Sequence, residues 1–222
     1  MSHIEYIHSE CNNMIYHLHN HLASKGHSSL EGHSGQILSQ MADLITLTTV
    51  WPRKPHLKIL EIGFNAGHSA LAFLMNPTAL VTSIDIGAHS YVLDAKAFID
   101  EKNPLRHTLV IGDSKTVLFK WLRDHPDDKF DFIFIDGAHD YSTAKADLDN
   151  CLKLCHDDTL IIMDDVIMPS VDTAMYGWAM GPSQAWAEAR SNNKVEQMER
   201  RDYAPGRGMA WGKKLTEAKG GP

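Results

Sequence analysis

The sequence lacks the features that mark disulfide-stabilised, membrane-spanning and nucleic-acid-binding proteins. Its three cysteines, Cys11, Cys151 and Cys155, are an odd number without framework spacing, so we expect reduced thiols, the last two on one helix. No apolar run is long enough to span a bilayer. The start of the chain is too polar for a signal peptide, and the formal net charge of -7 argues against a nucleic-acid partner. We therefore expect a cytoplasmic protein without a membrane or nucleic-acid partner.

The N-terminal part of the sequence predicts two amphipathic helices, over 4–23 and 35–50, with a loop over 26–32 between them. Pro52 and Pro55 are expected to end the second helix. Four histidines lie among the polar positions of the first helix: His8, His17, His19 and His21. Such a group suggests metal binding, but we interpret it as a solvated helix face. The apolar stripe of the same helix is a candidate surface for a homodimer.

From residue 57 onwards, short apolar segments alternate with helical segments. The expected strands cover residues 57–62, 80–86, 107–113, 130–136 and 158–165. The expected helices cover residues 68–75, 91–102, 115–125, 142–155 and 182–192. Several of these strands are continuously apolar, which is typical of parallel strands with helices on both faces of the sheet.

The C-terminal segment predicts an antiparallel hairpin with its turn at 204–208. No stretch of the sequence resembles a linker between domains. We therefore predict an α/β fold with a doubly wound, mostly parallel sheet and a closing hairpin. A single domain is expected over 1–222, with N-terminal helices in 1–50 and the sheet core in 57–213.

A glycine-containing turn follows the first expected strand, in the stretch LEIGFNAGHS at 60–69. Gly67 opens the next helix, whose free N–H groups suit a carboxylate or a phosphate. A dinucleotide fingerprint needs a further glycine between Gly63 and Gly67, and Asn65 stands there instead, which indicates a ligand without a pyrophosphate. Glu61 would place a carboxylate near a cationic or hydroxyl-bearing ligand. The alternative is an ordinary turn between strand and helix.

Acidic residues also end the second and third expected strands. Asp85 is placed to accept the two hydroxyls of a ribose, and the alternative is a cap of the strand end. Asp113 and Ser114 can bond the edge of an adenine or cap the next helix, and the two roles are compatible.

Two further strand ends carry aspartates, Asp136 on one strand and Asp164 with Asp165 on the next. Neighbouring parallel strands lie about 4.8 Å apart, so these carboxylates are expected to meet at one edge of the sheet. Carboxylates in one place repel each other unless a cation joins them, and oxygen ligands favour Mg²⁺, with Ca²⁺ and Mn²⁺ as alternatives. The other interpretation is that backbone N–H groups satisfy each carboxylate separately.

His139 is the candidate general base, because imidazole titrates near neutral pH. The alternatives are a structural histidine or a cofactor contact, and Asp140 and Tyr141 are secondary candidates for the base. The segment after Asp165 is rich in methionine and aromatic residues, among them Met175, Tyr176, Trp178 and Met180. It is either a lid over a substrate or local packing on the hairpin. The hairpin arginines Arg200, Arg201 and Arg207 are interpreted as a solvated tip rather than an anion site.

Together, these motifs over about residues 30–213 resemble the class I S-adenosylmethionine-dependent methyltransferases. Among them the chain is similar to the metal-dependent O-methyltransferases of the catechol type and of sugar and antibiotic pathways, which carry an IDGxHxY…DL…DD signature. The resemblance implies a Rossmann-like fold and methyl transfer from S-adenosyl-L-methionine to a hydroxyl oxygen of a small molecule. It also implies a divalent metal, with Mg²⁺ as the first candidate.

The resemblance carries roles to individual residues. Cofactor contacts are implied at Glu61, Gly63, Phe64, Asn65, Gly67, Ser69, Asp85, Asp113, Ser114 and Asp136. Metal ligands are implied at Asp136, Asp164 and Asp165, and catalytic roles at His139 and Asp136. Catechol-type enzymes carry a catalytic lysine where this chain has His139, so the base differs from that pattern. A metal-independent transferase and a non-catalytic S-adenosylmethionine-binding module are the alternatives.

Overall fold

The structure, a computed structural model, describes residues 2–50, 54–168 and 176–215. Expectations for Pro52 and Met175 fall outside these described residues. The chain forms two compact units, residues 1–113 and residues 114–222, and each is described by itself. Within the described residues, no helix has both the length and the hydropathy that crossing a membrane requires.

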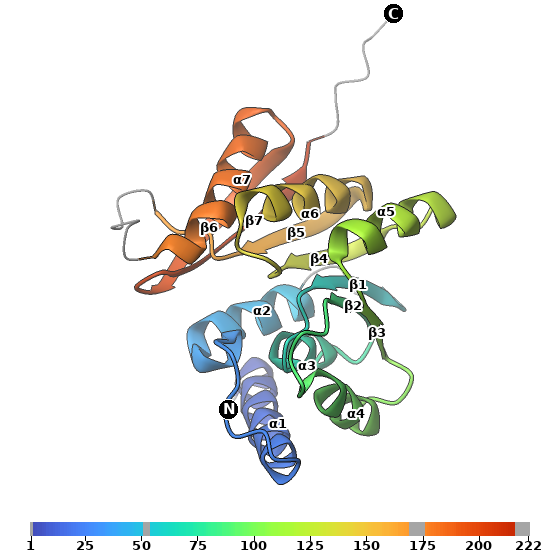
Figure 1. Ribbon diagram of the computed structural model, residues 1–222, viewed down its shortest axis with the longest axis vertical. Helices are drawn as coiled ribbons and strands as arrows, with labels where there is room; N and C mark the ends of the chain where they lie inside the picture. Colours follow the sequence, from blue (N-terminus) through green and yellow to red (C-terminus); the bar gives the residue numbers. More distant parts are fainter. Residues whose placement is uncertain (1, 51–53, 169–175, 216–222) are drawn as a thin grey trace, which may run out of the picture. The chain divides into compact units, whose positions relative to one another are not determined.

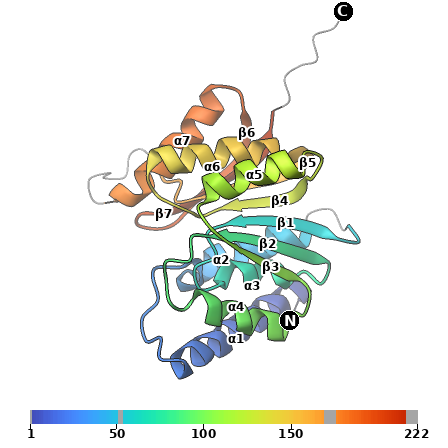
Figure 2. The same cartoon turned by 45° about the vertical axis from the view of Figure 1, so that its right-hand side comes forward.

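The first unit combines helices with a parallel three-stranded sheet in the order β3-β2-β1. Its elements are α1 (His3–Ser24), η1 (Ser34–Gln36), α2 (Leu38–Val50), β1 (Leu57–Ile62), α3 (His68–Leu74), β2 (Ala79–Asp85), α4 (Val92–Lys102) and β3 (His107–Ile111). The strands begin at nearly the same level, because Leu57 pairs with Ala79 and Val81 with His107. Figures 1 and 2 show α3 and α4 against the same side of these strands. The carboxyl ends of the strands therefore gather the turns that follow them.

Helix α1 is packed inside this unit along a single stripe. Its start is fixed by a capping box, in which Ser2 and Glu5 each accept the other's backbone N–H. The residues it buries recur at helical spacing: Cys11, Ile15, Leu18 and Leu22. Part of the apolar stripe considered as a dimer surface is thus covered within the unit, whereas Ile4, Ile7 and Met14 remain partly exposed and the homodimer stays a prediction.

The second unit contains a mixed sheet in the order β4-β5-β7-β6. Its elements are α5 (Ser114–Asp124), β4 (Phe130–Ile135), α6 (Tyr141–Lys153), β5 (Cys155–Asp164), η2 (Gly177–Ala179), α7 (Met180–Ser191), β6 (Val195–Ala204) and β7 (Arg207–Lys214). Strands β4 and β5 are parallel, whereas β7 is antiparallel to both β5 and β6. The predicted C-terminal hairpin is confirmed, and Figure 2 shows α5, α6 and α7 beside these strands.

One predicted boundary in this unit is wrong. Helix α6 ends at Lys153 rather than at Cys155, because Cys155 is already paired with Phe130 in the sheet. Pairing between strands has overridden the helical spacing that placed Cys151 and Cys155 on one helix. The expected reduced state agrees with the structure, since Cys11, Cys151 and Cys155 are all free and buried.

Candidate functional site

The turn after β1 contains two positions with backbone angles that favour glycine. Gly63 and Gly67 have φ angles of 91° and 81°, in the left-handed region that favours glycine. A Cβ on Gly67 would lie 2.6 Å from Ile99 Cδ1 and 2.9 Å from Phe64 Cζ. The glycine at this position therefore permits both the turn and the close packing beneath it.

Asp85 anchors this turn from the end of β2. One oxygen of its carboxylate accepts the N–H groups of Phe64, at 2.9 Å, and Asn65, at 2.8 Å. The other oxygen accepts the N–H of Gly87 at 2.7 Å. A carboxylate has about four lone-pair sites, so roughly one remains for a further donor. Asp85 therefore lies beside the glycine turn, and its predicted contact with the hydroxyls of a ribose stays a prediction.

Three residues predicted beside Asp85 have their side chains inside the first unit. Glu61 has no exposed surface, and its two oxygens accept the hydroxyls of Ser69 and Ser83 at 2.5 Å each. Ser83 is also hydrogen-bonded to His107, whose ring stacks on the buried ring of Phe64. Burial, as the largest cause, raises the pKa of Glu61 to about 7. Glu61 thus joins β1, β2 and α3 from within.

The buried carboxyl of Glu61 predicts a pH-dependent stability. Its pKa is raised from 4.5 to about 7 in the folded protein, so its contribution is fully present below pH 4.5 and is lost as the pH rises to about 7. Between these limits, wild type should lose about 3 kcal/mol of unfolding free energy relative to Glu61→Gln. Urea unfolding of both proteins at pH 5 and pH 8 measures this. If the unfolding free energies of wild type and Glu61→Gln differed by the same amount at pH 5 and pH 8, the raised pKa of Glu61 would be contradicted.

A loop before η1 adds contacts that the sequence did not predict. The Tyr91 hydroxyl donates to Asn65 Oδ1 at 2.8 Å and accepts the Glu31 N–H at 3.2 Å. The Glu31 carboxylate is paired with His89 at 2.8 Å. The glycine turn, the start of α4 and the loop around Glu31 are therefore linked. Contacts between residues so far apart in the sequence produce no periodic pattern. The sequence predicted only that residues 26–32 form a loop.

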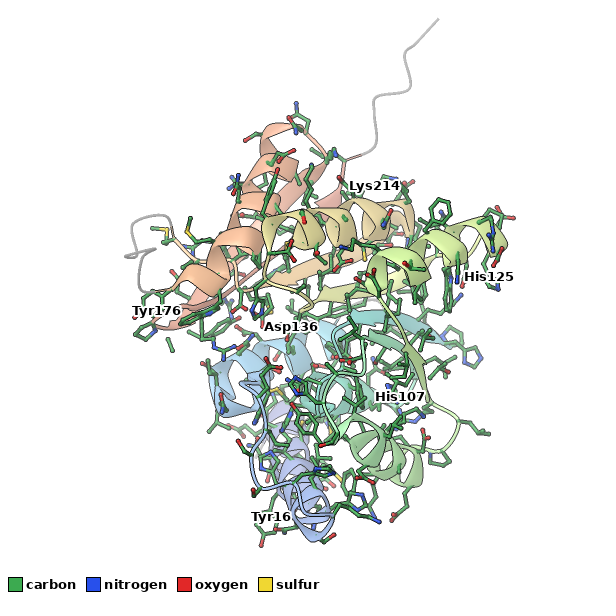
Figure 3. The ribbon with its side chains drawn as sticks, viewed as in Figure 1. Tyr16, His107, His125, Asp136, Tyr176 and Lys214 are labelled. Atoms are coloured by element: carbon green, nitrogen blue, oxygen red, sulfur yellow. The ribbon has the colours of Figure 1, made fainter. Side chains whose placement is uncertain are left out.

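In the second unit, Asp136, His139 and Asp165 each offer a ligand atom within 4.8 Å of the other two. Asp136 follows β4 directly, as Figure 3 shows. His139 Nε2 lies 3.0 Å from Asp165 Oδ2. Among the described residues, Asp164 does not join this group, although the sequence predicted it as a ligand. Successive side chains along a strand point to opposite faces of the sheet, and Asp164 is the last residue of β5.

The geometry of Asp165 suits a cation. Its φ angle is 55°, which turns the chain sharply after β5. Only 1% of the residue is exposed, and neither carboxylate oxygen has a hydrogen-bond partner among the described residues. Its neighbours are the His139 imidazole and Arg207, whose guanidinium is 4.0 Å away. A buried carboxylate requires a balancing positive charge, and the carboxylates of Asp136 and Asp165 fit a hard divalent ion.

The secondary candidates for the base are engaged elsewhere. Asp140 caps α6 by accepting the Thr143 N–H at 2.9 Å, and it also accepts the Ser142 hydroxyl. These hydrogen bonds lower the pKa of Asp140 to about 2, with Ser142 the largest cause, which makes it a poor base near neutral pH. The Tyr141 hydroxyl donates to Glu188 on α7. His139 is left as the titratable side chain of this loop that faces Asp165.

The loop of His139 rests on the first turn of α7. A Cβ on Gly181 would overlap the carbonyl oxygen of His139 and lie 2.6 Å from the Tyr141 nitrogen. Gly181→Ala should therefore displace His139 and lower turnover by about 10- to 100-fold. Gly177→Ala is the matched control, since no described atom lies within 4 Å of its added methyl group. Steady-state turnover of both variants measures the effect, and equal rates would show that the loop tolerates the methyl group.

The aromatic residues of the expected lid pack locally. The rings of Tyr176 and Trp178 meet edge to face at 5.4 Å, and both contact the position of Gly206 in the hairpin turn. Figure 3 shows Tyr176 beside the tip of this hairpin. The described part of the segment thus matches the alternative of packing against the hairpin. Arg207 is half-buried near Asp165 rather than at a solvated tip.

Comparisons with known proteins show which sequences and structures the chain is similar to. Residues 60–166 match a family described as a methyltransferase domain. An O-methyltransferase from Bacillus cereus, solved in complex with S-adenosylhomocysteine, is similar at 20% identity and a TM-score of 0.70, over 91% of each chain. The O-methyltransferase TomG of tomaymycin synthesis from Streptomyces achromogenes, solved with S-adenosylmethionine, is similar at 17% identity and 0.68, over 91% of this chain and 90% of that one.

A third similar structure is CalS11, a TDP-rhamnose 3'-O-methyltransferase of calicheamicin biosynthesis, at 17% identity and a TM-score of 0.58, over 78% of this chain and 76% of that one. No curated protein matched the sequence. The similar structures confirm the predicted fold class, a Rossmann-like α/β fold of mostly parallel strands with a C-terminal antiparallel hairpin. The predicted resemblance to class I methyltransferases is confirmed as well.

Proposed function

We propose that this chain, whose residues 60–166 match a methyltransferase domain, transfers a methyl group from S-adenosylmethionine to a hydroxyl oxygen of a small molecule. The observation that carries the proposal is the glycine turn held by Asp85 at the end of β2. The turn lacks the middle glycine of a dinucleotide fingerprint, with Asn65 in its place, which favours a nucleoside ligand without a pyrophosphate. Two of the similar proteins were solved with S-adenosylmethionine or its product bound, which supports the same cofactor here.

In this proposal the first unit recognises the cofactor. The remaining lone-pair site of Asp85 accepts a ribose hydroxyl, while Asn65 and the turn backbone face the methionine part. The side chains of Glu61, Phe64 and Ser69 are buried, so they support the glycine turn from the interior of the unit. Their contribution is to hold the turn, with any direct contact made by backbone groups.

The second unit is proposed to act on the acceptor. Asp136 and Asp165 would hold a divalent cation, Mg²⁺ first, which when bound lowers the pKa of an acceptor hydroxyl. His139 takes the proton as the O–H bond breaks. The oxygen forms its bond to the methyl carbon while the C–S bond breaks, and the electron pair of that bond stays on sulfur in neutral S-adenosylhomocysteine. Asp165, 3.0 Å from His139 Nε2, orients and stabilises the imidazolium.

A metal-independent transferase is the second candidate. The observation that favours it is Arg207, whose guanidinium lies 4.0 Å from Asp165. Arg207 can balance the charge of the buried carboxylate without an ion, which leaves His139 neutral before the reaction. In that case His139 would remain the base, and added Mg²⁺ would leave the rate unchanged.

A methyl-transfer assay over catechols, sugars and other polyols tests the proposal, with methyl-labelled S-adenosylmethionine and either Mg²⁺ or EDTA. Label in a methyl ether, with a rate that falls in EDTA, is the expected result. Turnover that ignores EDTA would select the metal-independent candidate. Cofactor binding without any methyl transfer would instead indicate a non-catalytic binding module.

A further inference from the structure

The first unit contains a group of histidines that the proposed reaction does not use. His19 comes from α1, His33 from the loop before η1, and His68 from the first position of α3. Their ligand nitrogens lie within 4.8 Å of one another. Of the α1 histidines that we interpreted as a solvated face, His19 is partly exposed and contacts His68.

The contacts within this histidine group are close. His19 Nε2 and His68 Nε2 are 2.8 Å apart. The rings of His33 and His68 stack at 3.5 Å with an angle of 8° between their planes. Only glycine fits beside them, because a Cβ on Gly35 would lie 2.7 Å from the ring of His68 and 2.9 Å from that of His33. The backbone at position 35 therefore lies close to the imidazole rings of His33 and His68.

We infer that His19, His33 and His68 form a binding site for a transition-metal ion of the Zn²⁺ class. Imidazole nitrogens suit Zn²⁺, Co²⁺, Ni²⁺ and Cu²⁺, whereas the oxygen-rich group in the second unit suits harder ions. Three histidines with one open position are an established coordination set for Zn²⁺. Ligand nitrogens around such an ion lie roughly 3.3 Å apart, so binding requires the stacked rings of His33 and His68 to tilt until their lone pairs converge.

The state of the imidazoles is compatible with this role. Metals bind the neutral form of imidazole. The 2.8 Å between the Nε2 atoms of His19 and His68 requires that at least one of these nitrogens carries no proton. Without an ion, one Nε2 must donate to the other. Either tautomer then leaves His68 Nδ1 buried and without a hydrogen-bond partner among the described residues.

An ion at this site would join three segments of the first unit. It would tie α1 and the loop before η1 to the first residue of α3, which directly follows the glycine turn. Ion binding to the folded state alone raises its stability by mass action. With Zn²⁺ at about 100 times its Kd, the Tm should rise by about 5 to 10 °C.

The test is a titration of the metal-stripped chain with Co²⁺, followed by visible absorption, and with Zn²⁺ in competition. All variants are made in the Asp165→Asn background, which weakens the acidic group of the second unit. His19→Gln and His68→Gln remove a ligand each. His17→Gln is the matched control, because His17 is on the same helix but exposed.

We expect one equivalent of Co²⁺ with a tetrahedral spectrum in the background and in the control. His19→Gln and His68→Gln should weaken binding by more than about 100-fold, beyond what the loss of an outer-shell partner causes. His19 is half-buried, so its variant gives an answer even where His68→Gln fails to fold. Equal Co²⁺ affinity of His19→Gln and His17→Gln would overturn the site. Neither outcome affects the methyl-transfer proposal, because that proposal rests on residues outside the histidine group.

Discussion

Replacing Asp165 by asparagine is expected to lower metal-supported methyl transfer by about 100- to 1,000-fold. The substitution removes the negative charge that faces His139 at 3.0 Å and that would hold the cation. Asparagine tolerates the φ angle of 55° at this position, so the backbone turn after β5 should persist. The affinity for S-adenosylhomocysteine should change by less than about threefold, since the cofactor residues lie elsewhere in the chain. Turnover at saturating Mg²⁺ and calorimetric binding measure the two quantities.

Two comparisons make this result specific. Asp127→Asn removes a charge from an exposed position of the same unit and should leave turnover unchanged. Asp164→Asn removes the neighbouring buried carboxylate, which does not join the group of Asp136 and His139. If Asp164→Asn reduced turnover as strongly as Asp165→Asn without loss of stability, both acids would have to act on the same ion.

Gly67→Ala is expected to destabilise the chain by about 2–4 kcal/mol and to weaken S-adenosylhomocysteine binding by at least tenfold. An alanine at a φ angle of 81° costs about 1–2 kcal/mol by itself. Its methyl group would also press on Ile99 and Phe64, at 2.6 Å and 2.9 Å. Relief of that contact must move the glycine turn, where the cofactor is proposed to bind. Urea unfolding and calorimetry give the two effects.

Gly26→Ala separates the two causes. Gly26 has a comparable φ angle of 92°, but no described atom lies within 4 Å of the added methyl group. It should therefore show only the backbone cost of about 1–2 kcal/mol and keep its affinity for S-adenosylhomocysteine. Equal effects of the two substitutions would mean that the packing under Gly67 is unimportant.

The sequence predicted the sheet well, because its strands are continuously apolar and their ends carry turn residues. Strand β1 was expected over 57–62 and covers Leu57–Ile62. Helix ends were less predictable where tertiary pairing competes, as at Cys155, which joins β5 instead of α6. Propensity is local, whereas pairing depends on a partner strand that the local pattern does not reveal.

The candidate site was predicted in outline and differs in the direction of individual side chains. Asp85 and Asp165 lie where strand ends were expected to bring them. Glu61 has the right position in the chain but points into the unit, toward Ser69 and Ser83. The sequence pattern of a strand predicts the face of the sheet on which a residue lies, but it does not predict whether that face offers hydrogen-bond partners for the side chain.

The contacts of His19 were beyond prediction for a related reason. Its spacing on α1 is that of a polar residue, and the sequence favours a solvated face. The structure brings it to His33 and His68 through the packing of three separate segments. Such convergence depends on loop paths, which composition and periodicity do not encode.

The most direct test of the account is a calorimetric titration of the wild-type chain with S-adenosylhomocysteine, repeated with Mg²⁺ and with EDTA. We expect one site with micromolar affinity in every condition, since the turn held by Asp85 is proposed to bind the cofactor without the metal. Absence of binding in all conditions would contradict the assignment of the glycine turn, and with it the proposed methyl transfer.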